Sequence, residues 1–414
     1  MHKNISDIES TEPVHAPFSC FYDPLYTPCD LQTAMNLAYR RPESDAIREL
    51  LEDARLPPDL AQATQNLAYR LCKNLRENKN DRLFSGIVQN LLQEFSLSSQ
   101  EGIALMCLAE ALLRIPDKKT RDLLIRDKIT QGEWQDHLGR SRSIFVNASA
   151  WGLLLSRRFV RQYSVSSELT LKNALSRVIK KSGEPLIRKA LNVTIRLMGE
   201  QFVTGETIEK ALKKSKKYEN KGFLYSYDML GEAALTEEDA KAYWMAYHNA
   251  IDVIGTAPKH RGVYESPGIS IKLSALHPRY TRSQYKVLVE ELYPCLLSLV
   301  QKARRYNIGI NIDAEETERL PISLSFLEKL CFEPDLKGWS GIGFVIQSYQ
   351  KRCPFVIDAL IDLAKRSEHR LMIRLVKGAY WDREIKHAQV EGLSDYPVYT
   401  RKPHTDISYL SLCS

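Results

Sequence analysis

The sequence predicts a mixed fold, in which an all-α N-terminal half is followed by an incomplete (β/α)8 barrel of the TIM type. From Asp30 to about residue 203, apolar residues recur three and four positions apart, as in amphipathic helices. After Thr204, short β-branched runs alternate with long amphipathic segments, which is typical of a parallel sheet. Such a sheet is either open and doubly wound or closed as a barrel. No GxGxxG motif follows the first predicted strand, which favours the barrel.

Composition and charge are those of a soluble protein of several domains. The chain has 414 residues, with 44% hydrophobic and 26% charged residues. Its net charge of +7 arises from 58 basic and 51 acidic residues spread along the chain, so we expect no nucleic-acid partner. The eight cysteines form no CxxC pair, and no secretion signal or membrane-spanning run is present. These features predict reduced thiols and a cytoplasmic location, with peripheral contact to the inner membrane left open.

The helical half divides further. Residues 1–28 mix Pro, Ser and aromatic residues without a period, which predicts a flexible tail. Residues 29–83 predict a helical arm whose three helices have little core of their own and must pack elsewhere. Residues 84–203 predict an α-helical domain, in which Ser98 begins a capping box before an apolar run. Residues 204–414 form the barrel portion.

The barrel portion contains five candidate strands. They are residues 268–276, 308–316, 342–350, 371–379 and 397–402. Four of the strands carry a charged or amide side chain in or toward their C-terminal half: Lys272, Asp313, Gln347 and Arg374. A charge in a buried strand must be paired or bound to a ligand, because burying it alone costs several kcal/mol, an order-of-magnitude figure.

In a barrel these four positions converge on the C-terminal mouth, where the active sites of this architecture lie. The alternative is a closed salt-bridge ring of Lys272, Asp313 and Arg374 that only fills the mouth. Two cations, one carboxylate and one amide suit an anionic ligand or a flavin ring better than a metal ion. The histidines, including His277 and His404, show no ligand spacing and are expected on the surface.

The segment LVKGAYWDREIK, residues 375–386, predicts a turn from a strand into a helix that begins near Tyr380 and Trp381. Small residues at Gly378 and Ala379 let the backbone approach a flat ligand, and free N–H groups at a helix start suit a phosphate. An ordinary tight turn between a strand and a helix has the same pattern, so both interpretations stay open.

These motifs, taken together, resemble a known family. GISIKLSALHPRY, INIDAEE, GIGFVIQSYQKRCP and LMIRLVKGAYWD are similar, in order and spacing, to the proline dehydrogenase barrel of bifunctional proline utilization A. The similarity extends back through SYDMLGEAALT to about Arg40. The resemblance implies an FAD-dependent enzyme that oxidises L-proline to 1-pyrroline-5-carboxylate and passes the electrons to a quinone at the membrane, in the catabolism of proline to glutamate.

The resemblance also implies roles for individual residues. Those implied to be catalytic or to line the substrate pocket are Lys272, Asp313, Arg374, Tyr380 and Glu232. Arg374 would lie near the flavin N5. The residues implied to bind FAD are Ala314, Gln347, Arg374, Val376, Gly378, Ala379, Trp381, Thr400 and Lys402. Thr400 and Lys402 would contact its distal part.

The sequence departs from the family pattern in its length. The segment from Gly268 to Ser414 is shorter than the about 250 residues of a (β/α)8 barrel, so we expect a truncated barrel that is inactive alone. A complementing C-terminal fragment and a homodimer formed through the arm are the expected protein partners. The alternative is a non-catalytic remnant or an interaction module without bound flavin.

Overall fold

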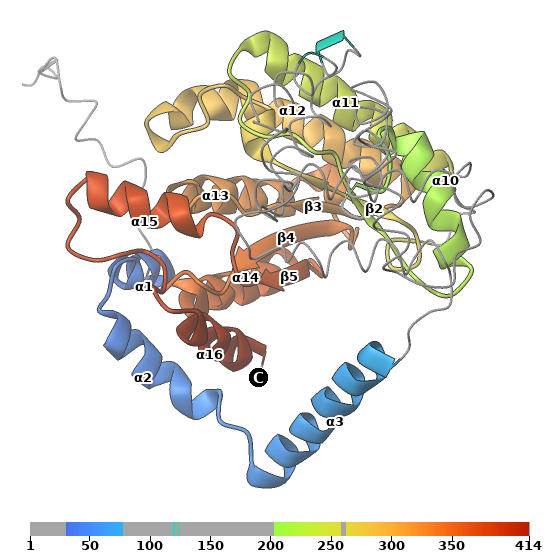
Figure 1. Ribbon diagram of the computed structural model, residues 1–414. Coiled ribbons are helices and arrows are strands. Elements are labelled where there is room, and N and C mark those ends of the chain that lie inside the picture. Colours follow the sequence, from blue (N-terminus) through green and yellow to red (C-terminus); the bar gives the residue numbers. More distant parts are fainter. Residues whose placement is uncertain (1–29, 78–118, 121–122, 124–202, 258–261, 414) are drawn as a thin grey trace, which may run out of the picture. The chain divides into compact units, whose positions relative to one another are not determined.

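A computed structural model describes residues 30–77, 119–120, 123, 203–257 and 262–413 (Figure 1). The chain forms two compact units, one of residues 1–56 and 224–414 and one of residues 57–223. The predicted tail and nearly all of the predicted helical domain lie outside the described residues, as does the capping box at Ser98.

The described part of the second unit consists mainly of two helices. Helix α3 spans Pro58–Glu77 and buries none of its residues. Its exposed apolar side chains include Leu60, Leu67, Leu71 and Leu75. Helix α10 spans Ile208–Glu219, and its N-cap residue Thr207 accepts a hydrogen bond from the backbone N–H of Lys210 at 3.4 Å. Neither unit contains, in its described residues, a helix long and apolar enough to cross a membrane.

The first unit contains a parallel sheet of five strands. The strands are β1 (Ser226–Asp228), β2 (Gly268–Ile271), β3 (Ile310–Ile312), β4 (Ile342–Gln347) and β5 (Met372–Val376). They lie side by side in the order β1-β2-β3-β4-β5, and each adjacent pair is parallel. A doubly wound sheet reverses its strand order at a switch point, whereas a barrel adds each strand beside the last. The sequential order confirms the barrel type.

Helices connect the strands and cover the sheet. They are α11 (Glu237–Thr256), α12 (Tyr285–Tyr306), α13 (Leu320–Cys331), α14 (Cys353–Ser367), α15 (Trp381–Val390) and α16 (Lys402–Cys413). Short 3-10 turns are η2 (Leu273–Ala275), η3 (Arg282–Gln284), η4 (Thr317–Arg319) and η5 (Pro334–Leu336). Apolar residues of α12 at Leu288, Leu292 and Leu296 recur every four positions and are fully buried. Every residue of β4 is buried too, so this strand lies at the centre of the core.

Two strand predictions need correction. The segment 397–402 is not a strand: Val398 makes a single antiparallel bridge to Gln350, and Lys402 already belongs to α16. Val398 and Tyr399 are fully buried, but they lie in a loop. β-Branched and aromatic residues favour buried positions as well as strands, so their presence alone does not identify a strand. The first strand, Ser226–Asp228, was missed, since three residues without an apolar run give no periodic signal.

The first two arm helices pack on this barrel portion. Helix α1 (Asp30–Ala38) contacts α14, and α2 (Glu43–Asp53) contacts α16 (Figure 1). The joint is a small apolar core of Ala46, Leu50 and Tyr399. The fully buried ammonium of Lys351 donates to the carbonyl of Arg41 at 3.0 Å and so secures the connection between α1 and α2.

Substitution of Leu50 tests this joint. Leu50→Ala is expected to lower the free energy of unfolding by about 2–3 kcal/mol, because Leu50 is 6% exposed and its loss leaves a cavity against Tyr399. Hydrogen exchange of the α2 amides and thermal melting measure the effect. Leu51→Ala is the matched control, since Leu51 on the same helix is 42% exposed, and it should change stability by less than about 0.5 kcal/mol.

Candidate functional site

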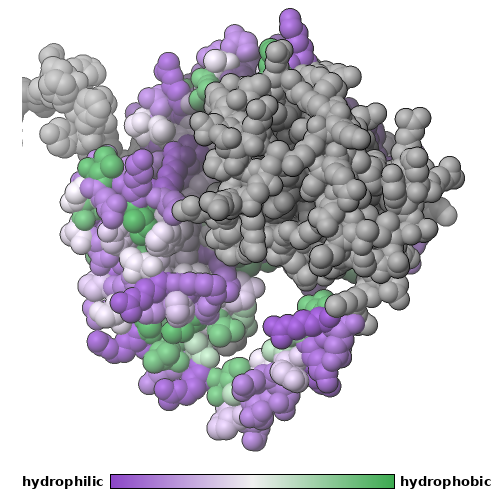
Figure 2. All heavy atoms as spheres, viewed as in Figure 1, coloured by the Kyte–Doolittle hydropathy of each residue, from purple (hydrophilic) through white to green (hydrophobic). Residues whose placement is uncertain are grey.

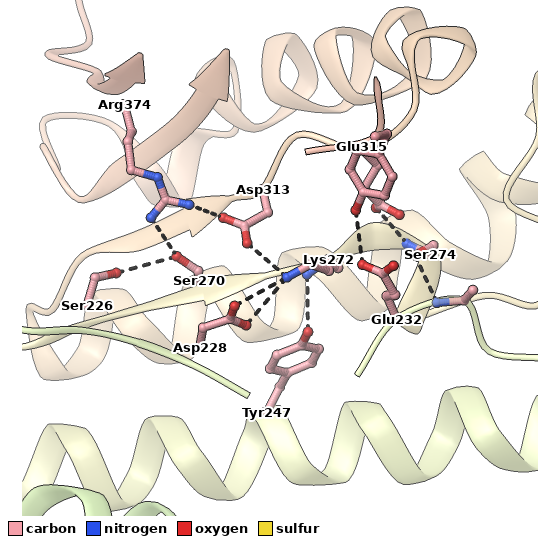
Figure 3. Close-up of polar contacts among 12 residues, drawn as sticks. Ser226, Asp228, Glu232, Tyr247, Ser270, Lys272, Ser274, Asp313, Glu315 and Arg374 are labelled. Atoms are coloured by element: carbon pink, nitrogen blue, oxygen red, sulfur yellow. Dashed lines mark hydrogen bonds and ion pairs between the residues drawn. The ribbon is translucent and has the colours of Figure 1, made fainter. Parts of the chain in front are cut away.

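The C-terminal ends of the strands bring four charged side chains together. Asp228 ends β1, Lys272 follows β2, Asp313 follows β3 and Arg374 lies on β5. The ammonium of Lys272 lies 3.1 Å from Asp313 Oδ2 and 3.4 Å from Asp228 Oδ2 (Figure 3). Nη2 of Arg374 donates to Asp313 Oδ1 at 2.5 Å. We call these four residues the charged row.

The charged row follows from barrel geometry. Side chains in one layer of a barrel interior come from alternate strands; Asp228 ends β1, Asp313 directly follows β3 and Arg374 lies on β5. The guanidinium of Arg374 therefore reaches Asp313 across β4. It also donates from Nη1 to Ser270 Oγ on β2 at 3.3 Å, and Ser270 in turn lies 3.4 Å from Ser226 Oγ. The row is thus tied to four of the five strands.

Charge in the row is balanced but unevenly exposed. Burial alone would lower the pKa of Lys272, but the carboxylates of Asp313 and Asp228 outweigh it and raise this pKa above its usual value. The side chains of Lys272 and Asp313 are 15% and 10% exposed, whereas that of Arg374 is 42% exposed. A ring that merely filled the mouth would bury all of its members. The side chain of Arg374, on the last of the five strands, is instead partly accessible, as is that of Asp228 at 40%.

The loops after β1, β2 and β3 are joined beside the row by Ser274 and Glu315. Ser274 Oγ accepts from the N–H of Ala233 at 3.0 Å, and the N–H of Ser274 donates to Glu315 Oε1 at 3.0 Å (Figure 3). Glu315 also accepts from Arg319 Nη1 at 2.9 Å. Burial raises the pKa of Glu315, since these hydrogen bonds offset only part of the lost hydration.

Tyr380 and Glu232 meet at the rim of the same region. The hydroxyl of Tyr380 donates to Glu232 Oε2 at 3.0 Å, although the two residues are far apart in sequence. Burial and the nearby charge of Glu232 raise the pKa of Tyr380 well above its usual value, so the hydroxyl stays protonated. This pair links the loop after β1 to the turn after β5.

The turn after β5 is held from behind by Gln347. Its Oε1 accepts from the N–H of Ala379 at 3.2 Å, and its Nε2 donates to the carbonyl of Glu315 at 2.8 Å. Gly378 has φ +144°, and an added Cβ would lie 2.4 Å from the ring of Tyr349, so only glycine fits there. Helix α15 begins at Trp381, which confirms the predicted turn from strand into helix.

Three further residues implied to bind a cofactor lie close to β5 or to Gln347. Val376 ends β5, and Trp381 is 42% exposed while its indole N–H donates to the carbonyl of Tyr399 at 2.8 Å. Ala314 lies directly after Asp313 and lines a small cavity with Gln347.

Lys402 begins α16, and Thr400 lies two residues before it. Both carboxylate oxygens of Glu43 on α2 accept from the N–H of Thr400 at 3.1 Å, and Oε2 also accepts from Thr400 Oγ1 at 2.8 Å. Although burial opposes it, hydrogen bonds from His404 and Thr400 lower the pKa of Glu43. Lys402 donates to Asp406 at 2.7 Å.

The prediction that His277 lies on the surface was wrong. This residue is 8% exposed, its Nδ1 accepts from the N–H of Arg279 at 3.1 Å, and its Nε2 lies 3.0 Å from Glu291. Because Nδ1 accepts, Nε2 carries the proton and the imidazole anchors the loop after β2. Among the described residues, no group of three His, Cys, Asp or Glu side chains is arranged to hold a metal ion.

Sequence reasoning missed four residues of this region. They are Asp228, Ser270, Tyr247 and Glu315. Asp228 lies in the missed strand, and Tyr247 on α11 accepts from the N–H of Lys272 through its hydroxyl at 3.2 Å. Glu315 was within reach of a sequence argument, because it stands in the same INIDAEE segment as Asp313.

Comparison with known proteins identifies the parts of the chain. The family described as "Proline dehydrogenase" matches residues 211–414. The description "Proline utilization A proline dehydrogenase N-terminal domain" matches residues 30–76. Residues 87–202 match "DNA-binding domain of Proline dehydrogenase". The DNA-binding description of residues 87–202 argues against our expectation that the protein has no nucleic-acid partner. That expectation stays an untested prediction.

Individual relatives agree with these matches. "Bifunctional protein PutA" of Klebsiella aerogenes is 64% identical over 403 residues, which are 97% of this chain and 30% of the relative. "Proline dehydrogenase 1" of Bacillus subtilis is 30% identical over 186 residues, 45% of this chain and 53% of the relative. A solved structure of a Bradyrhizobium japonicum Proline Utilization A variant has a TM-score of 0.64 at 39% identity, covering 93% of this chain and 37% of its own.

The chain therefore spans about 30% of the length of the curated PutA relatives, while those relatives match 97% of the chain. The three family matches follow one another along residues 30–76, 87–202 and 211–414, and the strand order and site residues described above lie within the last of them. Over 97% of its length, the chain is therefore similar to bifunctional proline utilization A proteins, and it matches a part of them.

Proposed function

We propose that this chain carries the flavin and substrate side of a proline dehydrogenase that oxidises L-proline to 1-pyrroline-5-carboxylate with FAD. The observation that carries the proposal is the charged row, in which a balanced set of ion pairs leaves the side chain of Arg374 42% exposed. A partly exposed cation at the C-terminal end of a barrel strand is typical of a ligand site.

The residues present are compatible with FAD. Arg374, Gly378, Ala379 and Trp381 are exposed in succession from β5 into the start of α15. This surface combines a cation, a flat stretch of backbone and an aromatic ring, which suits a planar, electron-rich ring system with an attached phosphate. Gln347 supports the surface from below through Ala379. Val376, Ala314, Thr400 and Lys402 complete the proposed set.

Bound FAD would supply the acceptor for the two electrons that proline loses together with two protons when its C–N bond becomes a C=N bond. Arg374 would stabilise negative charge that develops beside it, because a fixed cation in a site of low dielectric is worth more than the same cation in water. Asp313 and Lys272 would line the proline side, where Asp313 holds both cations in place. Tyr380, protonated and bonded to Glu232, would close the pocket.

Other partners belong to the same proposal. A quinone at the membrane surface would receive the electrons, and the protein would be cytoplasmic with peripheral membrane contact. A C-terminal segment would complete the barrel, because the described residues supply five of its eight strands. A homodimer through the arm is supported by apolar side chains gathered over α2 and α16, where Leu51 and Leu410 are 42% and 53% exposed (Figure 2).

The natural full-length protein tests the proposal. We expect a yellow protein whose flavin absorbance is bleached when L-proline is added without oxygen and recovers when a quinone is supplied. A colourless protein that binds no added FAD would support the alternative of a non-catalytic interaction module. If the protein contains flavin but L-proline does not reduce it, proline is not the substrate, and only the FAD part of the proposal stands.

A further inference from the structure

A tyrosine of the arm reaches the loop that carries part of the charged row. Tyr39 directly follows α1, and its hydroxyl lies 3.1 Å from Thr317 Oγ1. Thr317 belongs to the short segment from Asp313 to Arg319 that connects β3 to α13. Arm and loop are far apart in sequence but belong to the same compact unit.

Every polar atom of Thr317 is engaged in this arrangement. Its N–H and its hydroxyl both donate to the buried carboxylate of Glu384, each at 2.7 Å. Its carbonyl accepts a hydrogen bond from Arg352. Because a hydroxyl has only one proton and that of Thr317 goes to Glu384, the hydroxyl of Tyr39 must be the donor in their contact. Tyr39 therefore completes the hydrogen bonding of Thr317.

The ring of Tyr39 has a second role. The guanidinium carbon of Arg352 lies 4.5 Å from the centre of this ring, and Arg352 is only 4% exposed. Burial lowers the pKa of Arg352 to about 10, so the group remains charged at neutral pH and requires compensation. The ring face supplies part of it as a cation–π contact, and Gln350 Oε1 accepts from Arg352 Nε at 3.1 Å.

The segment from Asp313 to Arg319, which Tyr39 contacts at Thr317, carries site residues at its other end. Asp313 bridges Lys272 and Arg374, and Glu315 fixes the loop after β2 through the N–H of Ser274. Thr317 lies two residues beyond Glu315, at the start of η4, so the backbone has little freedom to absorb a shift between them. A displacement of Thr317 would therefore move both carboxylates.

We propose that Tyr39 is a positioning residue of the site, which acts through Thr317 and Arg352 to hold the loop bearing Asp313 and Glu315. The arm is then part of the scaffold of the site as well as a packing element. The consequence for turnover rests on the proposed proline dehydrogenase function, whereas the effect on the loop does not.

Two variants separate the contacts. Tyr39→Phe removes only the hydrogen bond to Thr317, and Tyr39→Leu removes the cation–π contact as well. Hydrogen exchange over residues 313–319 is expected to quicken by about tenfold in Tyr39→Leu and less in Tyr39→Phe, while β2 and β4 remain protected. Tyr69→Leu is the matched control, because Tyr69 lies on α3 of the arm and is 69% exposed.

Kinetics on the full-length protein supply the second readout. A loosened Asp313 should raise the KM for L-proline by about tenfold with a smaller fall in kcat, because a small misplacement weakens the hold on substrate. If Tyr39 acts through the hydroxyl of Thr317, Tyr39→Phe should not raise the KM further in a protein that already carries Thr317→Val. If the two residues act independently, the two effects on the KM should add. Thr317→Ser keeps the hydroxyl, so in that background Tyr39→Phe should again raise the KM.

The outcomes distinguish the two proposals. Faster exchange confined to residues 313–319 supports the positioning role, even in a protein that proves inactive toward proline. Unchanged exchange there, or a rise spread equally over β2 and β4, would overturn it, since the first shows no coupling and the second shows general destabilisation. An unchanged KM in an active Tyr39→Leu protein would also overturn it.

Discussion

Arg374→Met is expected to slow the reduction of bound flavin by L-proline by about a hundredfold or more, because one fixed charge aimed at a reacting group is worth that much in enzyme sites. The fold should survive, since Asp313 keeps its ion pair with Lys272 and the substituted side chain is 42% exposed. Anaerobic stopped-flow absorbance of the full-length protein measures the rate, and circular dichroism checks the fold.

Arg370→Met is the matched control for this substitution. Arg370 precedes β5 by two residues, and its guanidinium lies 5.2 Å from the centre of the Tyr264 ring, outside the charged row. It should leave the reduction rate unchanged. The rate of flavin reduction in Arg374→Lys should lie between those of Arg374→Met and the unaltered protein. A lysine keeps the charge but lacks the forked guanidinium that donates to Asp313 and Ser270 together. Flavin reduction at the normal rate in Arg374→Met would exclude the proposed role.

Asp313→Asn is expected to affect both stability and substrate affinity. The carboxylate of Asp313 accepts from Lys272 and Arg374, so its neutralisation leaves two cations with less compensation. Charge-assisted hydrogen bonds contribute about 1.5–3 kcal/mol each, and partial exposure of Arg374 reduces the sum to a loss of about 2–3 kcal/mol. Thermal melting should show a fall of about 5 °C or more.

The titration of Lys272 gives an independent check. Because Asp313 is the largest contribution that raises the pKa of Lys272, this pKa should fall in Asp313→Asn. The KM for L-proline should rise in the same variant. Asp335→Asn serves as the control, since Asp335 is exposed and its described partner is Gln301 at 3.1 Å. Equal melting temperatures for Asp313→Asn and the unaltered protein would show that the row does not stabilise the fold.

Much of the barrel portion was predictable, because its signal is local. Four of the five strands were found from β-branched runs, and Lys272, Asp313, Gln347 and Arg374 were recognised because charged or amide groups in such runs are costly. The strand β1 and the loop 397–402 were not, since a three-residue strand has no period and buried Val and Tyr residues occur in loops as well.

The sequence by itself determined which side chains stand at the strand ends, because the alternation of strands and helices and the position of each charge are local properties of the chain. The tertiary structure alone decided their partners. Asp228 joins Lys272 because β1 pairs with β2, and Glu43 meets Thr400 because α2 packs on α16. Tyr39, directly after α1, meets Thr317 in the segment after β3. These contacts link segments distant in sequence, and their energies arise only when burial brings the groups together, so no pattern along the chain records them.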